Sequence, residues 1–230
     1  MAAAGLFLAG TDTDVGKTRV AAAILRTLRS AGSLVAAYKP VASGFASVDD
    51  ERSDAWVLWD AAGRRGTPQD VCPQSFSAAI APPSSARAEG RHVDERLLRS
   101  GFVTRLTAGD VVVVEAAGGL FSPMADETLG IDLARDFSLP LVVVDAARLG
   151  AIGRTLGIVR ASRSEGLHLA AVVLSHTTPP GDDDGPVSPR TIAREAAAEI
   201  GRRTGVPVTI LDHGAERMPP GIDWLALATG

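Results

Sequence analysis

The fold of this 230-residue chain is decided near its start, by residues 6–18, which read LFLAGTDTDVGKT. The apolar run predicts a buried strand, the polar residues after it predict a turn, and Gly16 opens an Ala- and Leu-rich segment that is typical of a helix. A strand, a turn and a helix in this order, joined by Gly-Lys-Thr, are typical of a phosphate-binding loop. The sequence therefore predicts a P-loop at Thr11–Thr18 that binds a nucleoside triphosphate.

Three consecutive residues at the end of this loop would carry its chemistry. Gly16 lets the backbone come close to a ligand, so that loop N–H groups and the helix dipole can attract phosphate oxygens. Lys17 would place a point charge beside the β- and γ-phosphates, and the Thr18 hydroxyl would help to hold Mg²⁺. Thr11 stands at the position of the first glycine in the usual pattern, and Gly10 lies one residue earlier.

Strand-length apolar runs and longer helical patterns alternate through the rest of the chain. The predicted strands are Gly5–Ala9, Leu34–Tyr38, Val111–Val114, Leu141–Val144, Ala170–Leu174 and Val208–Leu211. The predicted helices are Gly16–Ser30, Ser53–Ala62, Asp94–Thr107, Ile131–Phe137, Gly150–Glu165 and Ser188–Thr204, and the predicted loops are Gly44–Arg52, Ala78–Ser85 and Thr177–Pro189. Such alternation predicts an α/β fold: a single, doubly wound domain over residues 1–230, whose mostly parallel sheet has helices on both faces. Ligands of such folds bind beyond the carboxyl ends of the strands.

Composition and charge argue against several other classes of protein. Hydrophobic residues make up 46% of the chain, charged residues make up 22%, and the net charge is −4. This is a globular composition without the basic excess of a nucleic-acid-binding protein. No apolar run is long enough to span a membrane, and Cys72 is the only cysteine, which indicates a reducing compartment. We therefore expect a cytoplasmic protein that acts on small molecules, with neither nucleic acid nor a membrane as partner.

Three carboxylates follow a strand or open a helix, where one of them could complete the coordination of Mg²⁺. Glu115 ends a buried strand and precedes Ala and Gly residues that would let the chain turn tightly beside a phosphate. Asp54 follows Ser53 at the start of a helix, and helix capping explains it as well as a metal does. Asp145 ends the next strand, where a turn residue is the better interpretation. Glu115 is therefore the preferred metal ligand of the three.

The segment Tyr38–Gly44 places a lysine at the carboxyl end of the second predicted strand. Lys39 and Lys17 are the only two lysines in the chain, whereas arginine is abundant. Two lysines at strand ends indicate a need for compact ammonium groups rather than for the guanidinium fork. The alternative is chance in a chain that otherwise uses arginine.

In order and spacing, these motifs resemble those of the dethiobiotin synthetase family. The family pattern has a Gly-Thr-Asp-Thr-x-Val-Gly-Lys-Thr loop, a Lys-Pro-Val-x-Ser/Thr-Gly segment, a Ser/Asn-Asp pair, a Glu-Gly-Ala-Gly-Gly turn and a Leu-Gly-x-Ile/Leu stretch. In this chain the corresponding residues are Gly10–Thr18, Lys39–Gly44, Ser53-Asp54, Glu115–Gly119 and Leu149–Ile152. The resemblance implies a fold of the P-loop NTPase type and an ATP-dependent cyclo-ligase.

The resemblance also implies the reaction. An amine of 7,8-diaminopelargonic acid takes up CO₂ as a carbamate, the carbamate attacks the γ-phosphate of ATP, and the second amine closes the ureido ring. The products are dethiobiotin, ADP and phosphate, and Mg²⁺ is the metal cofactor. Because anions are brought together at the reacting centre, positive charge and positioning would supply most of the catalysis.

By resemblance, each part of the site corresponds to residues of this chain. The catalytic residues would be Lys39 and Lys17, and the metal ligands would be Thr18, Asp54 and Glu115. The nucleotide would bind Asp14, Val15, Gly16, Lys17, Thr18, Arg19, Asp54, Glu115, Ala116, Ala117, Gly118, Ser175 and His176. The substrate would bind Thr13, Lys39, Ser43, Ala151, Ile152 and Gly153, of which the last three would serve the neighbouring subunit of a homodimer.

Two departures from the family pattern concern the nucleotide. Ala116 stands where the family usually has Gly, which adds a methyl group to the predicted turn. Ser175 and His176 stand where the family has the Asn-Asp pair that reads adenine, and they lack the paired donor and acceptor of an amide. The sequence therefore leaves the nucleobase preference open.

One alternative class shares the P-loop but acts by binding partners, namely the ATPase switches of the partitioning and septum-site kind. Those proteins carry a second lysine inside the phosphate loop. This loop has Thr11, Asp12, Thr13 and Asp14 ahead of Val15, with no lysine before Lys17. An enzyme is therefore the preferred interpretation.

Overall fold

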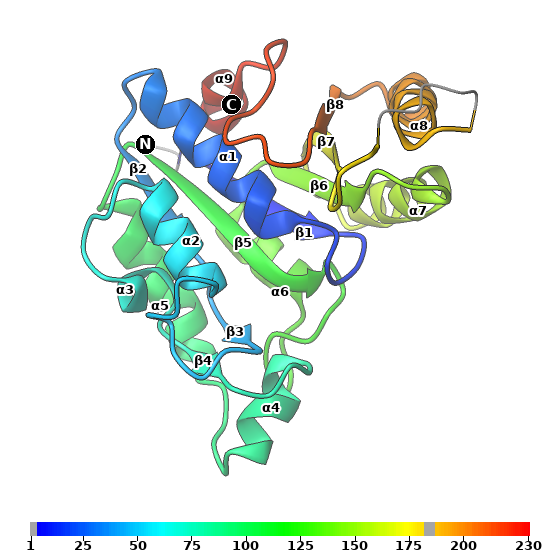
Figure 1. Ribbon diagram of the computed structural model, residues 1–230. Coiled ribbons are helices and arrows are strands. Elements are labelled where there is room, and N and C mark those ends of the chain that lie inside the picture. The colour runs from blue at the N-terminus through cyan, green and yellow to red at the C-terminus, as the bar shows by residue number, and fades with distance from the viewer. Residues whose placement is uncertain (1–3, 182–186) are drawn as a thin grey trace.

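The computed structural model describes residues 4–181 and 187–230. At its centre is a six-stranded parallel sheet in the order β2-β5-β1-β6-β7-β8 (Figure 1). Its strands are β1 (Gly5–Gly10), β2 (Val35–Tyr38), β5 (Val111–Gly119), β6 (Leu141–Ala146), β7 (Leu169–Ser175) and β8 (Val208–Leu211). The predicted parallel sheet is confirmed. Because β1 lies between β5 and β6, the loop after it sits where the strand order reverses, which is the ligand-binding position in such folds.

Helices cover both faces of the sheet, as the alternation predicts. One face carries α1 (Lys17–Ser30), α2 (Asp54–Ala61) and α9 (Trp224–Thr229), and the other carries α5 (Glu95–Leu106), α6 (Gly130–Phe137), α7 (Ala151–Ser164) and α8 (Pro189–Thr204). Alternate residues of a strand point to opposite faces. In β5, Val111 and Val113 therefore enter the core beneath α1, while Val112 and Val114 enter the other core.

Side-chain caps explain where two of these helices begin. Ser53 accepts a hydrogen bond from the N–H of Trp56 at the start of α2, and Ser188 accepts one from the N–H of Thr191 at the start of α8. Both satisfy N–H groups that have no partner within the helix. The cap of α2 is thus Ser53 and not Asp54, which leaves the Asp54 carboxylate for other contacts.

The region beside the pocket contains elements that the sequence does not predict. A loop is expected at Ala78–Ser85, but α4 (Pro82–Ala88) begins inside it, so this expectation is wrong from Pro82 onward. Proline is tolerated in the first turn of a helix, where its missing N–H would have no partner, so two prolines can start α4 rather than prevent it. Close to α4 lies a separate two-stranded sheet of β3 (Ala42–Ser43) and β4 (Ser75–Phe76) (Figure 1).

Strand β5 is longer than expected. The sequence predicts a tight turn at Glu115–Gly119, but the strand continues through this segment, because Gly119 still pairs with Gly10 of β1. The register shifts between Leu8 and Gly10, so β5 has extra residues there, as in a β-bulge. Within this irregularity Gly118 has a φ of 63°, a left-handed conformation that favours glycine.

The remaining segments are mostly irregular. A short helix, α3 (Pro68–Val71), starts with a capping box between Thr67 and Asp70. The loop predicted at Gly44–Arg52 contains neither helix nor strand. The loop predicted at Thr177–Pro189 is irregular up to residue 181 and again just before α8, while residues 182–186 lie outside the described part of the chain.

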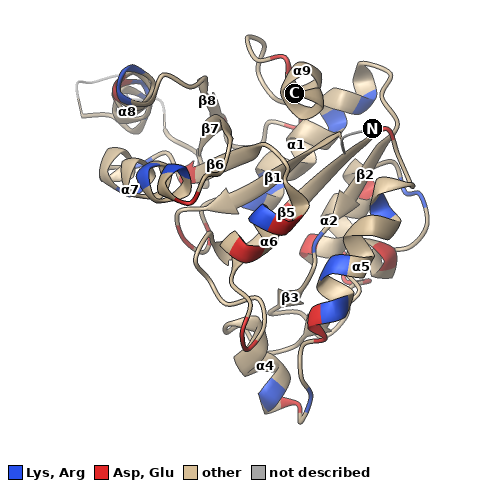
Figure 2. Cartoon of the chain, turned by 180° about the vertical axis from the view of Figure 1, so that it is seen from behind, with Lys and Arg blue, Asp and Glu red and all other residues tan. Residues whose placement is uncertain are grey.

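The surface carries charges of both signs. Figure 2 shows basic and acidic residues together along α5, and some of them form ion pairs, such as Arg99 Nε with Asp136 Oδ2 at 2.7 Å. Among the helices of residues 4–181 and 187–230, none combines the length and the apolar character needed to cross a bilayer.

Candidate active site

A pocket of about 660 Å³ opens at the carboxyl edge of the sheet, beside the loop that follows β1. Its wall is formed by the phosphate loop, the start of α1, the segment after β2, the start of α2 and the end of β5. The predicted site residues in this wall are Thr13, Asp14, Gly16, Lys17, Thr18, Arg19, Lys39, Ser43, Asp54, Glu115, Ala117 and Gly118. The fold thus gathers side chains from distant parts of the sequence around one hollow.

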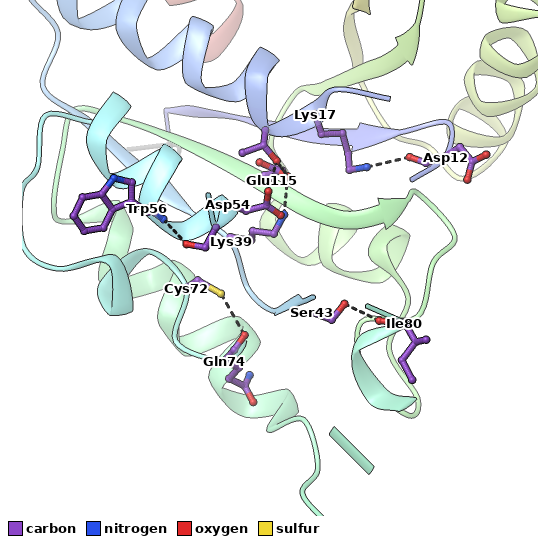
Figure 3. Close-up of polar contacts among 12 residues, drawn as sticks. Asp12, Lys17, Lys39, Ser43, Asp54, Trp56, Cys72, Gln74, Ile80 and Glu115 are labelled. Atoms are coloured by element: carbon purple, nitrogen blue, oxygen red, sulfur yellow. Dashed lines mark hydrogen bonds and ion pairs between the residues drawn. The ribbon is translucent and has the colours of Figure 1, made fainter. Parts of the chain in front are cut away.

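Two features shape the phosphate loop. Gly16 has a φ of 90°, and a Cβ added to it would lie 2.6 Å from Oγ of Ser175, so both its conformation and the space around it require glycine. Lys17 is the first residue of α1, and its Nζ donates a hydrogen bond to the carbonyl of Asp12 at 3.0 Å (Figure 3). The ammonium group therefore lies across the loop whose N–H groups would hold a phosphate. Lys17 is 7% exposed, and this burial lowers the pKa of its ammonium group below 10.5.

The affinity for nucleotide should fall in alkaline solution. This fall should begin at a lower pH than it would if Lys17 were an exposed lysine. Because the pKa of Lys17 in the folded protein lies below 10.5, the group loses its proton before that pH is reached. Only the charged form attracts phosphate, so the dissociation constant for ADP should already rise in the alkaline range below pH 10.5, as measured by calorimetry. Lys17→Arg is the control, because arginine stays charged, and its weaker affinity should not change with pH. A wild-type affinity that stays constant over this range would contradict a role for Lys17 in phosphate binding.

At the bottom of the pocket, Lys39 bridges two carboxylates (Figure 3). Its Nζ lies 2.7 Å from Oε1 of Glu115 and 2.5 Å from Oδ2 of Asp54. Lys39 and Glu115 are only 2% and 1% exposed, so water hardly competes for these contacts. Oγ1 of Thr18 lies 2.8 Å from both Oδ1 of Asp54 and Oε1 of Glu115. A hydroxyl has one hydrogen and donates to one of these oxygens at a time. We call these four side chains the carboxylate cluster.

The charges of the carboxylate cluster stabilise one another. Burial lowers the pKa of Lys39, but Asp54 and Glu115 together raise it more, so its pKa lies above the ordinary value and the ammonium stays charged. Burial raises the pKa of Asp54, but Lys39 outweighs this effect and the net pKa lies below the ordinary value. For Glu115, burial dominates and raises the pKa. The cluster thus depends on Lys39 to keep two carboxylates close together.

The oxygen atoms of the carboxylate cluster fit Mg²⁺. Thr18, Asp54 and Glu115 offer hydroxyl and carboxylate oxygens, which Mg²⁺ prefers. Oε2 of Glu115 is buried and has no hydrogen-bond partner among the described residues, so it is available as a ligand. In the described parts of the chain, no group of three His, Cys, Asp or Glu side chains could hold a metal ion. Because Mg²⁺ usually combines one or two carboxylates with water and phosphate, these residues suit a metal that binds together with a nucleotide.

Ser175 and His176, which the resemblance implies as base contacts, lie outside the pocket wall that the described residues form. Ser175 is fully buried behind Gly16, at the end of β7. His176 is 5% exposed, and its carbonyl accepts a hydrogen bond from Nη1 of Arg19 at 3.0 Å. The next residue, Thr177, reaches the wall. In this structure the side chain of Ser175 therefore lies against Gly16 rather than in the pocket wall.

Replacing Ser175 by alanine should stabilise the protein slightly and leave the nucleobase preference unchanged. Its Oγ is buried and has no hydrogen-bond partner within the described residues. An unpaired buried hydroxyl costs about 1 kcal/mol or more, so its removal should raise Tm by roughly 2–4 °C in a thermal unfolding experiment. The ratio of the dissociation constants for ATP and CTP should stay that of the wild type. A changed ratio would mean that Ser175 reads the base after all.

Ala116 and Val15 also point away from the pocket. Because successive residues of a strand alternate in direction, Glu115 and Ala117 line the pocket whereas Ala116 packs in the core on the other face, together with Val114. The methyl group that distinguishes Ala116 from the glycine of the family pattern therefore packs in the core rather than in the pocket wall. Val15 is fully buried and packs in the core beneath α1.

The predicted substrate segment Ala151–Gly153 lies at the start of α7, outside this pocket. Ala151 is buried, Ile152 is half-buried and Gly153 is exposed. Leu149, just before the helix, is 83% exposed. This end of α7 is therefore accessible in the single chain, and its contact with the substrate of a neighbouring subunit stays a prediction.

Another part of the pocket wall comes from residues that the sequence did not single out, namely Gly44, Phe45, Ala79, Ile80, Ala81, Pro82, Ser122, Pro123 and Thr177. Ser43 connects the predicted site to this wall, because its Oγ donates a hydrogen bond to the carbonyl of Ile80 at 2.6 Å (Figure 3). Ser122 accepts a hydrogen bond from the N–H of Gly119 at 2.8 Å and closes the end of β5. The prolines at the start of α4 are a sequence signal for this part of the wall, since the segment Ala79–Pro82 supplies four of these nine residues.

Comparisons with known proteins agree with this geometry. A family model described as an AAA domain matches residues 4–210. The ATP-dependent dethiobiotin synthetase BioD of Rhodopirellula baltica is 39% identical over 228 residues, which cover 94% of this chain and 84% of the relative. The protein of the same name from Anaeromyxobacter dehalogenans is 42% identical over 192 residues, covering 83% of this chain and 84% of the relative. The one from Phenylobacterium zucineum is 39% identical over 183 residues, covering 77% and 78% of the two chains.

Proposed function

This chain belongs to the family of ATP-dependent dethiobiotin synthetases, and we propose that it forms dethiobiotin in the pocket beside its phosphate loop. The substrates would be 7,8-diaminopelargonic acid, CO₂ and ATP, and the products dethiobiotin, ADP and phosphate. One observation carries this proposal. Lys17 and Lys39, the only two lysines of the chain, line the same pocket as the carboxylates Asp54 and Glu115.

The phosphate loop would bind the triphosphate of ATP. Residues 13–18 lead into the start of α1, where backbone N–H groups and the positive end of the helix dipole would attract phosphate oxygens. Lys17 would exchange its hydrogen bond to the Asp12 carbonyl for contacts with the β- and γ-phosphates. Arg19 lies in the pocket wall on the side of Thr177, where the rest of the nucleotide would lie.

Lys39 would bind the carbamate. An ammonium group has three N–H donors, and the contacts with Asp54 and Glu115 occupy two of them. The third is free to bind the carbamate oxygen that attacks the γ-phosphate. Held in a buried site, this charge would stabilise the transition state, in which negative charge gathers between the carbamate and the phosphoryl group.

Thr18, Asp54 and Glu115 would hold Mg²⁺, which neutralises charge on the phosphate oxygens as the phosphoryl group is transferred. Their positions follow from three different elements. Thr18 belongs to the first turn of α1, Asp54 is the first residue of α2, and Glu115 lies in β5. These residues do not have to supply every ligand of Mg²⁺, since a nucleotide would provide further oxygen ligands.

The remaining wall suits the rest of the organic substrate. Thr13 and Ser43 would offer hydroxyl groups to its amines, while Phe45, Ile80 and Pro82 add apolar surface for an alkyl chain. The segment Ala151–Gly153 would reach the distant carboxylate of a substrate bound to the other subunit of a homodimer. Small anionic substrates and reduced Cys72 fit a cytoplasmic enzyme.

The alternative, a partner-binding ATPase switch of the partitioning or septum-site kind, is not favoured. The relatives reported above are named as synthetases, and the loop from Thr11 to Val15 has no lysine that could serve as the second one. Such a switch would also have no need of Lys39 in a pocket wall.

The purified chain, incubated with 7,8-diaminopelargonic acid, bicarbonate, Mg²⁺ and ATP, should yield dethiobiotin, detected by its mass. Omitting the diamino acid should abolish ADP formation above the slow background, because the phosphoryl group has no acceptor. Formation of ADP at the same rate without the diamino acid, and no dethiobiotin with it, would overturn the proposal and favour an ATPase switch.

A further inference from the structure

The carboxylate of Asp145 is buried but takes no part in the pocket wall. It lies near the end of β6 and is 0% exposed. A buried charge is costly unless hydrogen bonds and opposite charges compensate it. The sequence suggests a turn residue here, but Asp145 is still part of the strand, and its side chain joins elements that are far apart in the chain.

Donors from three directions surround this carboxylate. Oγ1 of Thr11 donates to Oδ1 at 2.6 Å, and the N–H of Ala146 donates to the same oxygen at 2.7 Å. Nε of Arg154 lies 3.2 Å from both carboxylate oxygens, and Oγ1 of Thr155 donates to Oδ2 at 3.3 Å. The carboxylate therefore connects α7, which carries Arg154 and Thr155, with the first residue of the phosphate loop.

Thr11 is the point where the phosphate loop is fixed to the sheet. Besides its side-chain bond to Asp145, its N–H donates to the carbonyl of Val144 at 2.9 Å. The following residues, Asp12–Asp14, are exposed, and the side chain of Asp12 accepts a local hydrogen bond from the N–H of Thr13 at 2.7 Å. The direction in which the loop leaves β1 thus depends on how firmly β6 holds Thr11.

Arg154 packs closely against the turn at the start of α7. A Cβ added to Gly150 would lie 2.9 Å from Nη1 of Arg154, and Gly150 has a φ of 89°, so a side chain there would disturb both the turn and the guanidinium group. Arg154 is 30% exposed on its side chain, whereas its partner Asp145 is wholly buried. Arg154 thus supplies the positive charge that compensates the buried carboxylate of Asp145 behind the phosphate loop.

We propose that Asp145 is a positioning residue for the phosphate loop: held by Arg154 and Thr155, its carboxylate fixes Thr11 and with it the backbone that cradles the nucleotide phosphates. The proposal rests on the proposed function in that the loop binds a nucleotide. Backbone donors stabilise phosphate only when they point at it without rearrangement. When Thr11 is released from Asp145, the exposed part of the loop gains freedom that nucleotide binding must remove again.

The test compares five variants in the full-length protein. Asp145→Asn removes the charge at nearly constant shape, and Thr11→Val removes the hydroxyl while the buried ion pair with Arg154 stays intact. Both should raise the dissociation constant for Mg·ADP by about tenfold, measured by calorimetry, and the double variant should be no weaker than Asp145→Asn alone. Thr11→Ser, which keeps the hydroxyl, should bind like the wild type. Thr155→Val contacts the same carboxylate from α7 and is the matched control: its Tm should fall, but its affinity for Mg·ADP should stay within about twofold.

Three results would overturn the inference. One is a lowered Tm with unchanged affinity in both Asp145→Asn and Thr11→Val, which would make the network merely structural. A second is an additive loss in the double variant, since the two residues would then act separately. A third is a wild-type protein that binds no nucleotide, which would overturn the proposed function as well. Product formation is measured separately, so an inactive wild type that binds Mg·ADP tests the proposed function alone.

Discussion

Replacing Lys39 by methionine should slow dethiobiotin formation by about a thousandfold or more and change the dissociation constant for ATP by no more than about threefold. Methionine keeps the length of the side chain but removes the ammonium group that lies 2.7 Å from Glu115 and 2.5 Å from Asp54. In the proposed mechanism the charge acts where the carbamate meets the phosphoryl group, whereas the phosphates of bound ATP would keep their contacts with Lys17 and the loop. Single-turnover kinetics gives the first quantity and calorimetry the second.

Two further variants are the controls for Lys39→Met. Lys39→Arg keeps the charge, but its planar fork does not fit a buried site that was shaped for a compact ammonium, so turnover should still fall by about a hundredfold. Arg64→Met removes an exposed cation that pairs with Asp60 at 2.8 Å, and its activity should equal that of the wild type. If Lys39→Met binds ATP and retains more than about a tenth of wild-type turnover, Lys39 is not a catalytic residue.

Replacing Glu115 by glutamine should lower turnover by about a hundredfold and raise the Mg²⁺ concentration for half-maximal rate by about tenfold. Glutamine has the same shape but is a weaker ligand for a hard cation. Its Tm should not fall, because Lys39 keeps its contact with Asp54 and because Oε2 of Glu115 has no partner to lose among the described residues. Activity should thus fall while stability is retained, which steady-state kinetics over a range of Mg²⁺ concentrations and thermal unfolding would record.

The control for this variant is Glu127→Gln, which neutralises an exposed glutamate and should change neither quantity. An unchanged requirement for Mg²⁺ in Glu115→Gln would remove Glu115 from the set of metal ligands. A strong loss of stability would show that its charge serves the fold instead.

The strands and the phosphate loop could be predicted because their signals are local. Uninterrupted apolar runs indicate strands that are buried on both faces, and residues 6–18 contain a strand, a turn and a helix start within a short stretch. The carboxyl edge of the sheet could be inferred from strand direction alone. Strand direction therefore predicts the edge of the sheet at which Lys17, Lys39 and Glu115 lie.

The contact between Lys39 and Glu115 could not be predicted from local signals, because it depends on which strands pair and in what register. In the structure Tyr38 of β2 pairs with Val114 of β5, so the next residues along each strand lie side by side. The strand order that separates β1 from β2 by β5 comes from the packing of the whole sheet. The resemblance to a known family implies that Lys39 and Glu115 belong to one site, which the periodicity of the sequence does not show.

The direction of individual side chains is the second feature that the sequence does not predict. Ser175 and Ala116 belong to segments that reach the pocket, but the alternation along a strand sends their side chains away from it. Which residues of a strand face a ligand depends on register, and in β5 the register shifts between Glu115 and Gly119, within the pocket wall. A pattern of residue types can thus locate a segment at a site without showing which of its side chains reach the ligand.

The pocket wall contains three cations and three anions, namely Lys17, Arg19, Lys39, Asp14, Asp54 and Glu115, so its formal charges cancel. The chain as a whole carries a net charge of −4, which repels a nucleotide at long range. The net charge of the chain therefore gives ATP no long-range attraction, and its binding would depend on contacts within the pocket. A site of this kind loses little when the ionic strength of its surroundings rises, because screening removes only the long-range part of the interaction.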